Sequence, residues 1–326
     1  MLISVMLLVI TISLFLILPN DATLSQIPLT YASVPAIVEA PAHIALKKEF
    51  FKGHGLDITM EINPDGKTSL DQLFAGTVDI AAVMATPIVF SSFEREDFII
   101  IGKIDHAKIH FAYASEESDI DTPQDLSGKR VAYMPNTSGH YFLNNWLLYN
   151  HLTPEDIIPV PCNGPEALEA MEKGRADAMF YWFPFPQLLK ERLGDQIREL
   201  ESNRLVPSSW IIVTKREFAD NNREAVLRFL RSLKESINFI EEAPKISEEL
   251  YAEMNALDSQ IIGTIFPTLH FDLILDQSLL LDLEEQARWA ISLQEEKTPL
   301  VPNFLDIIDV SFLKEISPSS VSIIGR

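Results

Sequence analysis

Residues 67–87 constrain the fold of this chain more than any other stretch. Residues 68–75 place their apolar side chains at the spacing of one helical face. Thr68 or Ser69 can cap the start of this helix. Gly76 can end it, because glycine adopts positive φ freely. Residues 78–84 form an almost continuous apolar run, typical of a strand buried on both faces. Thr86 can then cap a new helix. We therefore expect a helix, a strand and an open helix N-terminus, the place where open α/β sheets bind ligands.

The same unit recurs later in the chain with different residues. Residues 165–178 again predict a helix, a glycine stop at Gly174 and the start of a strand that contains an aspartate. Two copies indicate two similar α/β halves. Extended segments predict that the chain crosses between these halves at residues 112–115 and again at residues 206–210.

Four stretches carry a resemblance to a known family. They are HIALKKEFFKGHGLDI, LFAGTVDIA, DLSGKRVAYMPNTSGHYFL and ALEAMEKGRADAMFYW, which fall within residues 26–210. Together they resemble the substrate-binding proteins of ABC importers for nitrate, sulfonates and taurine, a group related in fold to proteins that handle thiamine pyrimidine precursors. The resemblance implies a two-lobed type II periplasmic-binding-protein fold, with two doubly wound α/β sheets joined by a two-stranded hinge.

The resemblance and the repeated unit together predict the domains. We expect lobe one to contain residues 26–113 and 207–326, and lobe two to contain residues 114–206. Residues 1–18 are almost wholly apolar, without a basic start or a good cleavage site, so residues 1–22 are either an export signal or an uncleaved anchor. Both alternatives place the protein in the periplasm or another extracytoplasmic space, and in the second alternative residues 1–18 anchor it there.

Composition excludes several classes of function. The chain has 326 residues and a formal net charge of −21, which argues against nucleic-acid binding because phosphates require a basic surface. The negative net charge does not exclude a small anionic ligand, because the N–H groups at a helix N-terminus can bind an anion locally. Cys162 is the only cysteine, so no internal disulfide or cysteine-based metal site can form. His106 and His110 would not converge on a metal from an extended strand. We expect a monomer with no metal and no cofactor.

The candidate binding residues lie in loops that would face one cleft. Hydroxyl groups and backbone N–H groups at helix N-termini can bind an oxyanion without a full counter-charge, although each serine or threonine alone also suits a plain helix cap. Lys67 is the only cation in these loops, and the glycine that a phosphate loop needs before Gly66 is missing. The candidates are Ser33, Lys67, Thr68, Ser69 and Thr86 in lobe one; Asn136, Thr137, Ser138, Gly139, Tyr181 and Trp182 in lobe two; and Trp210 at the second crossing.

The aromatic segment that follows residue 180 indicates the character of the ligand. Tyr181 and Trp182 could stack on an organic group or belong to the core of lobe two. In the family that the chain resembles, a glutamate commonly follows this tryptophan, but this chain has Phe183. The difference weakens the inference of an amine-binding pocket and favours a more apolar one.

Catalytic motifs are scarce in this sequence. Ser138-Gly139-His140 lacks a G-x-S-x-G frame, and no H-E-x-x-H occurs. We therefore predict a non-enzymatic, exported solute-binding protein that delivers a small anionic or sulfonate-like ligand to an ABC permease. One alternative is a membrane-anchored ligand sensor or adaptor. The other is an enzyme of the thiamine-precursor type, which the resemblance disfavours because its cysteine-rich segment is absent.

Overall fold

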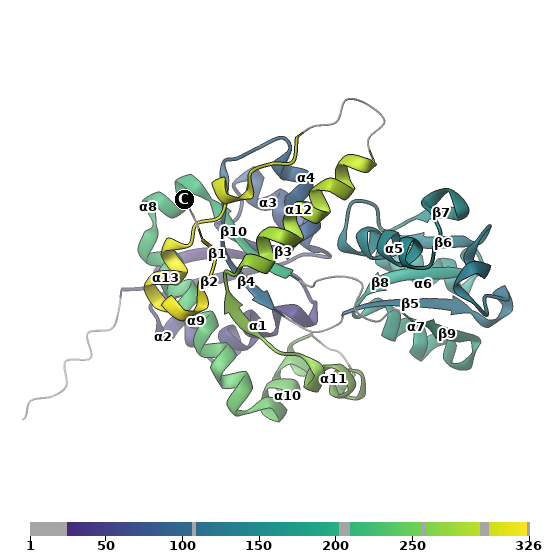
Figure 1. Ribbon diagram of the computed structural model, residues 1–326. Helices are drawn as coiled ribbons and strands as arrows, with labels where there is room; N and C mark the ends of the chain where they lie inside the picture. Colours follow the sequence, from purple (N-terminus) through teal and green to yellow (C-terminus); the bar gives the residue numbers. More distant parts are fainter. Residues whose placement is uncertain (1–24, 106–108, 202–208, 256–257, 294–299, 325–326) are drawn as a thin grey trace, which may run out of the picture.

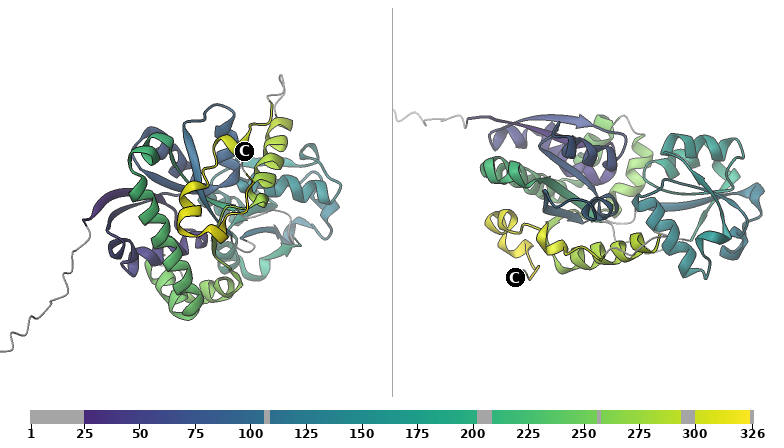
Figure 2. Two further views of the ribbon diagram at one scale, coloured as in Figure 1. Left: turned by 60° about the vertical axis from the view of Figure 1, so that its left-hand side comes forward. Right: turned by 90° about the horizontal axis from the view of Figure 1, so that it is seen from above.

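The chain folds around two separate β-sheets. The computed structural model describes residues 25–105, 109–201, 209–255, 258–293 and 300–324. Their strands form a six-stranded and a five-stranded sheet, which lie side by side in Figure 1 and as two bodies in the right-hand view of Figure 2. We call the six-stranded sheet with its helices lobe one, and the five-stranded sheet with its helices lobe two.

Lobe one is built from the two ends of the described chain. Its first part comprises β1 (Ile27–Ser33), α1 (Ala40–Lys47), α2 (Phe50–Gly53), β2 (Leu56–Ile62), α3 (Gly66–Ala75), β3 (Ile80–Met84), α4 (Ala85–Ser92) and β4 (Phe98–Asp105). Its second part comprises β10 (Ser209–Lys215), α8 (Arg216–Asn221), α9 (Arg223–Glu242), α10 (Pro244–Asn255), α11 (Ser259–Ile265), β11 (Asp272–Ile274), α12 (Gln277–Ser292) and α13 (Ser311–Ile316). The sheet order is β11-β4-β10-β3-β1-β2.

Lobe two comes from the middle of the chain. It comprises β5 (His110–Ser115), β6 (Arg130–Tyr133), α5 (Ser138–Tyr149), β7 (Ile158–Pro161), α6 (Gly164–Glu172), β8 (Ala178–Trp182), α7 (Phe185–Leu193) and β9 (Ile197–Leu200). The sheet order is β7-β6-β8-β5-β9. In both sheets three parallel strands adjoin a strand that runs antiparallel, β10 in lobe one and β5 in lobe two, so each sheet is mixed.

The repeated unit that the sequence predicts is present in both lobes. Gly76 ends α3 with a φ of 76°, and Gly174 follows α6 with a φ of 61°. After each glycine an aspartate fixes the edge of the next strand. Asp79 accepts a hydrogen bond from the backbone N–H of Thr30 at 2.7 Å, and Asp177 accepts one from that of Arg130 at 2.8 Å. Each aspartate thus joins a new strand to its parallel neighbour, and the two halves share one construction.

Two details differ from the sequence prediction. The first expected crossing, residues 112–115, lies inside β5 of lobe two, so the chain has already left lobe one after β4. Thr68, Ser69 and Thr86 are not helix caps. Asp65 caps α3 by accepting a hydrogen bond from the N–H of Thr68, and α4 already begins at Ala85. Asp65 lies one residue before α3, so its side chain can reach the free N–H groups of the first turn. A hydroxyl inside the helix cannot do this.

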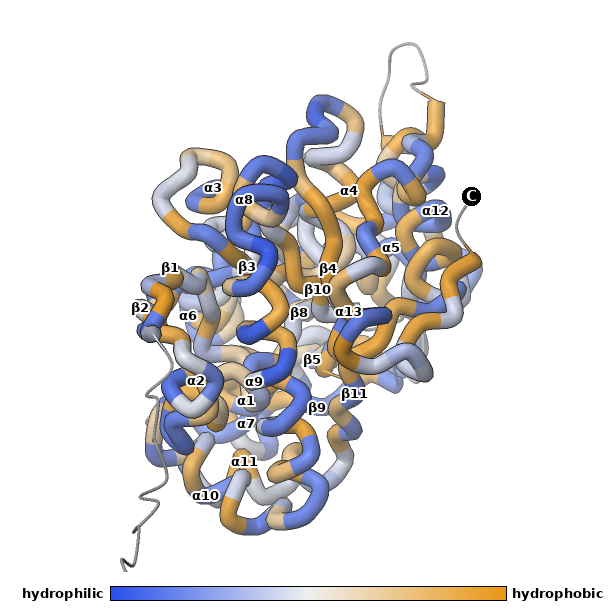
Figure 3. Tube along the Cα trace, turned by 90° about the vertical axis from the view of Figure 1, so that its left-hand side faces the viewer, coloured by the Kyte–Doolittle hydropathy of each residue, from blue (hydrophilic) through white to orange (hydrophobic). Residues whose placement is uncertain are grey.

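The apolar core covers both faces of each sheet. In Figure 3 the central strands β3, β4 and β10 are largely hydrophobic, whereas outer helices such as α8 carry hydrophilic residues. Tyr141 and Phe183 of lobe two belong to the buried core cluster of lobe one, so the lobes share apolar contacts. Among the described residues no helix is long and apolar enough to cross a bilayer. Residues 1–18 and His106 lie outside that part of the chain.

Candidate ligand-binding pocket

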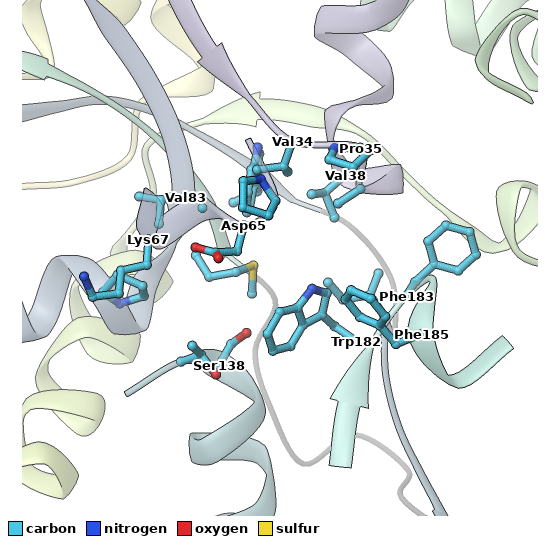
Figure 4. Close-up of a pocket in the computed structure, with 18 of the residues that line it drawn as sticks. Val34, Pro35, Val38, Asp65, Lys67, Val83, Ser138, Trp182, Phe183 and Phe185 are labelled. Atoms are coloured by element: carbon cyan, nitrogen blue, oxygen red, sulfur yellow. The ribbon is translucent and has the colours of Figure 1, made fainter. Parts of the chain in front are cut away.

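A cavity of about 180 Å³ lies between the lobes, where the strands that carry the predicted loops end (Figure 4). Both lobes contribute to its wall. Lobe one provides Val34, Pro35, Ala36, Val38, Pro64, Asp65, Gly66, Lys67, Val83, Met84, Pro87 and Trp210; lobe two provides Thr137, Ser138, Trp182, Phe183, Pro184 and Phe185; and Ile109 lies at the first crossing. Most of these side chains are apolar, so the wall suits a ligand with an apolar body.

Five of the twelve predicted site residues line this cavity: Lys67, Thr137, Ser138, Trp182 and Trp210. Lys67 contributes less charge than expected, because its Nζ lies 2.6 Å from Oδ2 of Asp71 on the next turn of α3. The hydroxyl of Thr137 is also engaged, since it donates to the backbone oxygen of Met134 at 2.7 Å. Ser138 is therefore the hydroxyl best placed for a ligand.

Four predicted residues of lobe one do not line the cavity. Ser33 is fully buried and donates to Glu39, while Ser69 is fully buried and accepts a hydrogen bond from Asn63 at 3.2 Å. Thr86 is also fully buried, and its hydroxyl donates to the side chain of Gln286 on α12. The structure places Ser33, Thr68, Ser69 and Thr86 outside the cavity wall.

Three predicted residues of lobe two also lie outside the wall. Asn136 is exposed and has a φ of 58°. Tyr181 is fully buried, and its hydroxyl donates to the backbone oxygen of Cys162, so it belongs to the core of lobe two. Gly139 lies directly behind Trp182, because a Cβ on Gly139 would be 3.0 Å from the indole. Its role is to leave room for the tryptophan.

The polar end of the cavity is formed at the start of α5. Oγ of Ser138 lies 2.9 Å from Nε2 of His110, and both residues are buried. If His110 donates to this oxygen, the hydroxyl hydrogen of Ser138 is free to donate to a ligand. No sequence motif indicates this contact, because His110 lies 28 positions before Ser138. Ser138 and the N-terminus of α5 can together bind a ligand oxygen.

The aromatic end is formed by the segment that joins β8 to α7. Trp182 and Phe185 pack with their ring planes at 82°, and Figure 4 shows Trp182, Phe183 and Phe185 grouped on one side of the cavity. Phe183 is 1% exposed and lies in the lobe-one core cluster. The apolar character that Phe183 predicted is thus present, although its ring packs largely against the other lobe.

A buried polar network supports the lobe-one wall from behind. Trp210 lines the cavity, and its indole N–H donates to the carboxylate of Glu39. Glu39 also accepts hydrogen bonds from the hydroxyls of Tyr31 and Ser33. Among the described residues no lysine or arginine forms an ion pair with Glu39. Burial raises the pKa of Glu39 to about 7, and the three hydrogen bonds partly oppose this increase.

The network continues away from the cavity through His43. Its Nε2 lies 3.0 Å from Oγ of Ser33, and its Nδ1 lies 3.0 Å from Nδ2 of Asn255. Burial lowers the pKa of His43 to about 4, so the ring is neutral near pH 7. With Glu39 ionised, Ser33 donates to Glu39, His43 donates to Ser33 and Asn255 donates to His43. Sequence reasoning missed Glu39 and His43, because a lone charged residue in an apolar helix start carries no motif.

Comparisons with known proteins agree with this architecture. A family model described as "NMT1/THI5 like" matches residues 37–247. A putative aliphatic sulfonates-binding protein of Bacillus subtilis is 22% identical over 282 residues, which are 85% of this chain and 84% of that protein.

Two solved structures share the fold. The alkanesulfonate-binding protein SsuA from Xanthomonas axonopodis pv. citri, bound to MOPS, has a TM-score of 0.76 at 20% identity and covers 89% of this chain and 100% of its own. The desulfurization enzyme DSZB has a TM-score of 0.63 at 14% identity, and the match covers 88% of this chain and 98% of the enzyme's chain. The chain therefore has the two-lobed fold of periplasmic binding proteins and belongs to the NMT1/THI5-like family.

Proposed function

We propose that this protein is the solute-binding component of an ABC importer and holds a small organic anion between its lobes. The observation that carries the proposal is a single cavity with walls from both lobes, for example Val34 and Met84 on one side and Ser138 and Trp182 on the other. A ligand that contacts both lobes favours their closed arrangement over an open one. A permease can then distinguish loaded from empty protein by its shape.

The lobes move as units in this proposal. Among the described strands, consecutive strands change sheet between β4 and β5 and between β9 and β10. In this proposal lobe two begins at β5 and ends at β9, and it moves relative to lobe one when a ligand binds. Export to an extracytoplasmic space follows from the role in import, and the protein works there as a monomer.

The sulfonate class of ligand rests on the site and on the relative named for aliphatic sulfonates. Ser138 and the N-terminus of α5 provide donors for a sulfonate oxygen. Trp182, Phe185 and Val34 provide an apolar wall for the carbon chain. The cavity of about 180 Å³ is of the same order as a cavity of roughly 150 Å³ that binds benzene, so the organic part is a short chain or a single ring.

A catalytic function is the alternative that the structural likeness to the desulfurization enzyme DSZB favours. In the lobe-one network, Ser33 lies next to both a histidine and a carboxylate, but it is fully buried and does not line the cavity. The carboxylate of Glu39 contacts Ser33 directly, whereas in a catalytic triad the carboxylate contacts the histidine. These positions support binding without turnover.

The test is calorimetry with a series of alkanesulfonates on the purified protein, together with native mass spectrometry to find a ligand carried through purification. We expect saturable binding at one site and no release of sulfite on prolonged incubation. Absence of binding for every alkyl and aryl sulfonate would exclude the proposed ligand class. Sulfite release would instead establish an enzyme.

A further inference from the structure

The charges on the cavity wall do not match a pocket for a simple anion. Asp65 and Lys67 are the charged residues among those that line it. The Lys67 ammonium is paired with Asp71, whose side chain is 59% exposed. The Lys67 side chain therefore extends toward solvent along α3. Figure 4 shows the amine of Lys67 at the edge of the view and the carboxylate of Asp65 nearer to the middle. The unbalanced charge on the wall is therefore negative.

One oxygen of Asp65 remains available to a ligand. Its Oδ1 caps α3 by accepting a hydrogen bond from the N–H of Thr68 at 2.8 Å. Within the part of the chain that the structure describes, its Oδ2 has no hydrogen bond or ion pair, and the residue is only partly buried. The same cap removes the N-terminus of α3 as an anion site, because a carboxylate already occupies it.

The two ends of the cavity therefore differ in chemistry. Ser138 and the start of α5 provide donors in lobe two, whereas Asp65 provides an acceptor with a full negative charge in lobe one. Neutral apolar side chains such as Val83, Met84 and Trp182 line the space around them. A purely anionic ligand would meet Asp65 without compensation, but a ligand with a cationic end would pair with it.

We propose, on the basis of the function above, that Asp65 is a specificity-determining residue that selects zwitterionic ligands with an ammonium group at one end and a sulfonate at the other. The ammonium binds Oδ2 of Asp65, and the sulfonate binds at Ser138. Phe183 brings no charge to the cavity beside Trp182, so the negative charge that binds the ammonium comes from Asp65 of the opposite lobe.

The test compares two ligands of nearly the same size, butanesulfonate and homotaurine, in which an ammonium replaces the terminal methyl. Calorimetry should show that the wild type prefers homotaurine by about tenfold or more, the scale of a charge-assisted hydrogen bond. Asp65→Asn should remove this preference by weakening homotaurine and leaving butanesulfonate equal or tighter. Asparagine retains the helix cap, so the variant should fold normally.

Asp57→Asn is the matched control. It makes the same chemical change in lobe one, on β2, at an exposed side chain outside the cavity wall. The preference for homotaurine should survive in this variant. If the wild type binds both ligands equally, or Asp65→Asn weakens both equally, the role of Asp65 is refuted while the proposed function stands. If neither ligand binds the wild type, the sulfonate class and the role of Asp65 are both refuted.

Discussion

The indole N–H of Trp210 donates a hydrogen bond to the buried carboxylate of Glu39, and the same indole forms part of the cavity wall. Glu39 is 1% exposed and Trp210 is 3% exposed. The carboxylate precedes α1, whereas the tryptophan lies on β10, so one hydrogen bond ties together two distant parts of lobe one. A change in the charge of Glu39 therefore alters a hydrogen bond made by a wall residue.

The first prediction concerns the pH dependence of stability. The pKa of Glu39 is about 7 in the folded protein and 4.5 as its ordinary value, so the folded state binds this proton more tightly. The resulting stabilisation is complete below pH 4.5 and is lost as the pH rises through 7, by about 3 kcal/mol in total. Glu39→Gln removes this titration. In urea unfolding, the wild type should lose stability relative to the variant between pH 5 and pH 8.

Neighbouring groups do not reproduce this signature. His43 has its pKa lowered to about 4, so its contribution grows as the pH rises from 4 to 6.5, which is the opposite sign, and it is present in both proteins. Burial raises the pKa values of Tyr31 and Tyr251, which face Glu39 and stay neutral over this range. Parallel stability profiles for wild type and Glu39→Gln would show that Glu39 does not titrate in this way.

The second prediction separates two adjacent hydroxyls. Ser138→Ala should weaken butanesulfonate binding by about 1–3 kcal/mol, the scale of a hydrogen bond to a charged group. Thr137→Ala should weaken it much less, because the Thr137 hydroxyl already donates to the backbone oxygen of Met134. Calorimetry on both variants checks this order. Equal losses, or a larger loss for Thr137→Ala, would contradict a direct role for Ser138.

The repeated α/β units could be predicted from the sequence because their signals are local. A helical stripe, a glycine and an apolar run lie within about twenty residues, and Gly76 and Gly174 both adopt the positive φ that their positions require. The sequence places the first crossing between lobes too late, because an extended run such as residues 110–115 does not reveal which sheet it joins.

Individual site residues could not be predicted as well, because their roles depend on distant partners. Thr86 suits a helix cap in sequence, but its hydroxyl bonds to Gln286, 200 positions away. Lys67 suits an anion site, but Asp71 pairs with it. Phe183, which follows Trp182 in the aromatic segment, predicts an apolar pocket, and most of the side chains that line the cavity are apolar. The sequence of this segment does not distinguish Tyr181, which is in the core, from Trp182, which lines the cavity.

The third prediction concerns the space behind Trp182. A Cβ on Gly139 would lie 3.0 Å from the indole and 3.3 Å from the backbone oxygen of Phe180, so Gly139→Ala should push the indole out of place. We expect butanesulfonate affinity to fall several-fold while the free energy of unfolding changes by about 1 kcal/mol or less, since alanine is favoured over glycine in a helix. Gly53→Ala is the control, because its Cβ meets nothing within 4 Å. Unchanged affinity in Gly139→Ala would show that the indole position is not critical.

The last prediction assigns the fluorescence response. Trp182 is partly buried on the cavity wall, so a bound ligand changes its surroundings directly. Butanesulfonate should shift the tryptophan emission, and Trp182→Phe should remove most of that shift. Trp289 is unsuitable as a control because it packs against His140 and Tyr141 of α5, at 5.0 and 5.1 Å between ring centroids, and would respond to movement between the lobes.

Trp146 is the better control. It is 1% exposed in the core of lobe two, and its indole donates to the backbone oxygen of Glu201 at 2.9 Å. Trp146→Phe should therefore leave the ligand-induced shift intact. Trp182→Ala should also weaken binding at least several-fold, because stacking contributes roughly 0.5–1.5 kcal/mol beyond the buried area. If Trp182→Ala binds butanesulfonate as tightly as the wild type, Trp182 is structural, and the ligand is held by Ser138 and the start of α5 without it.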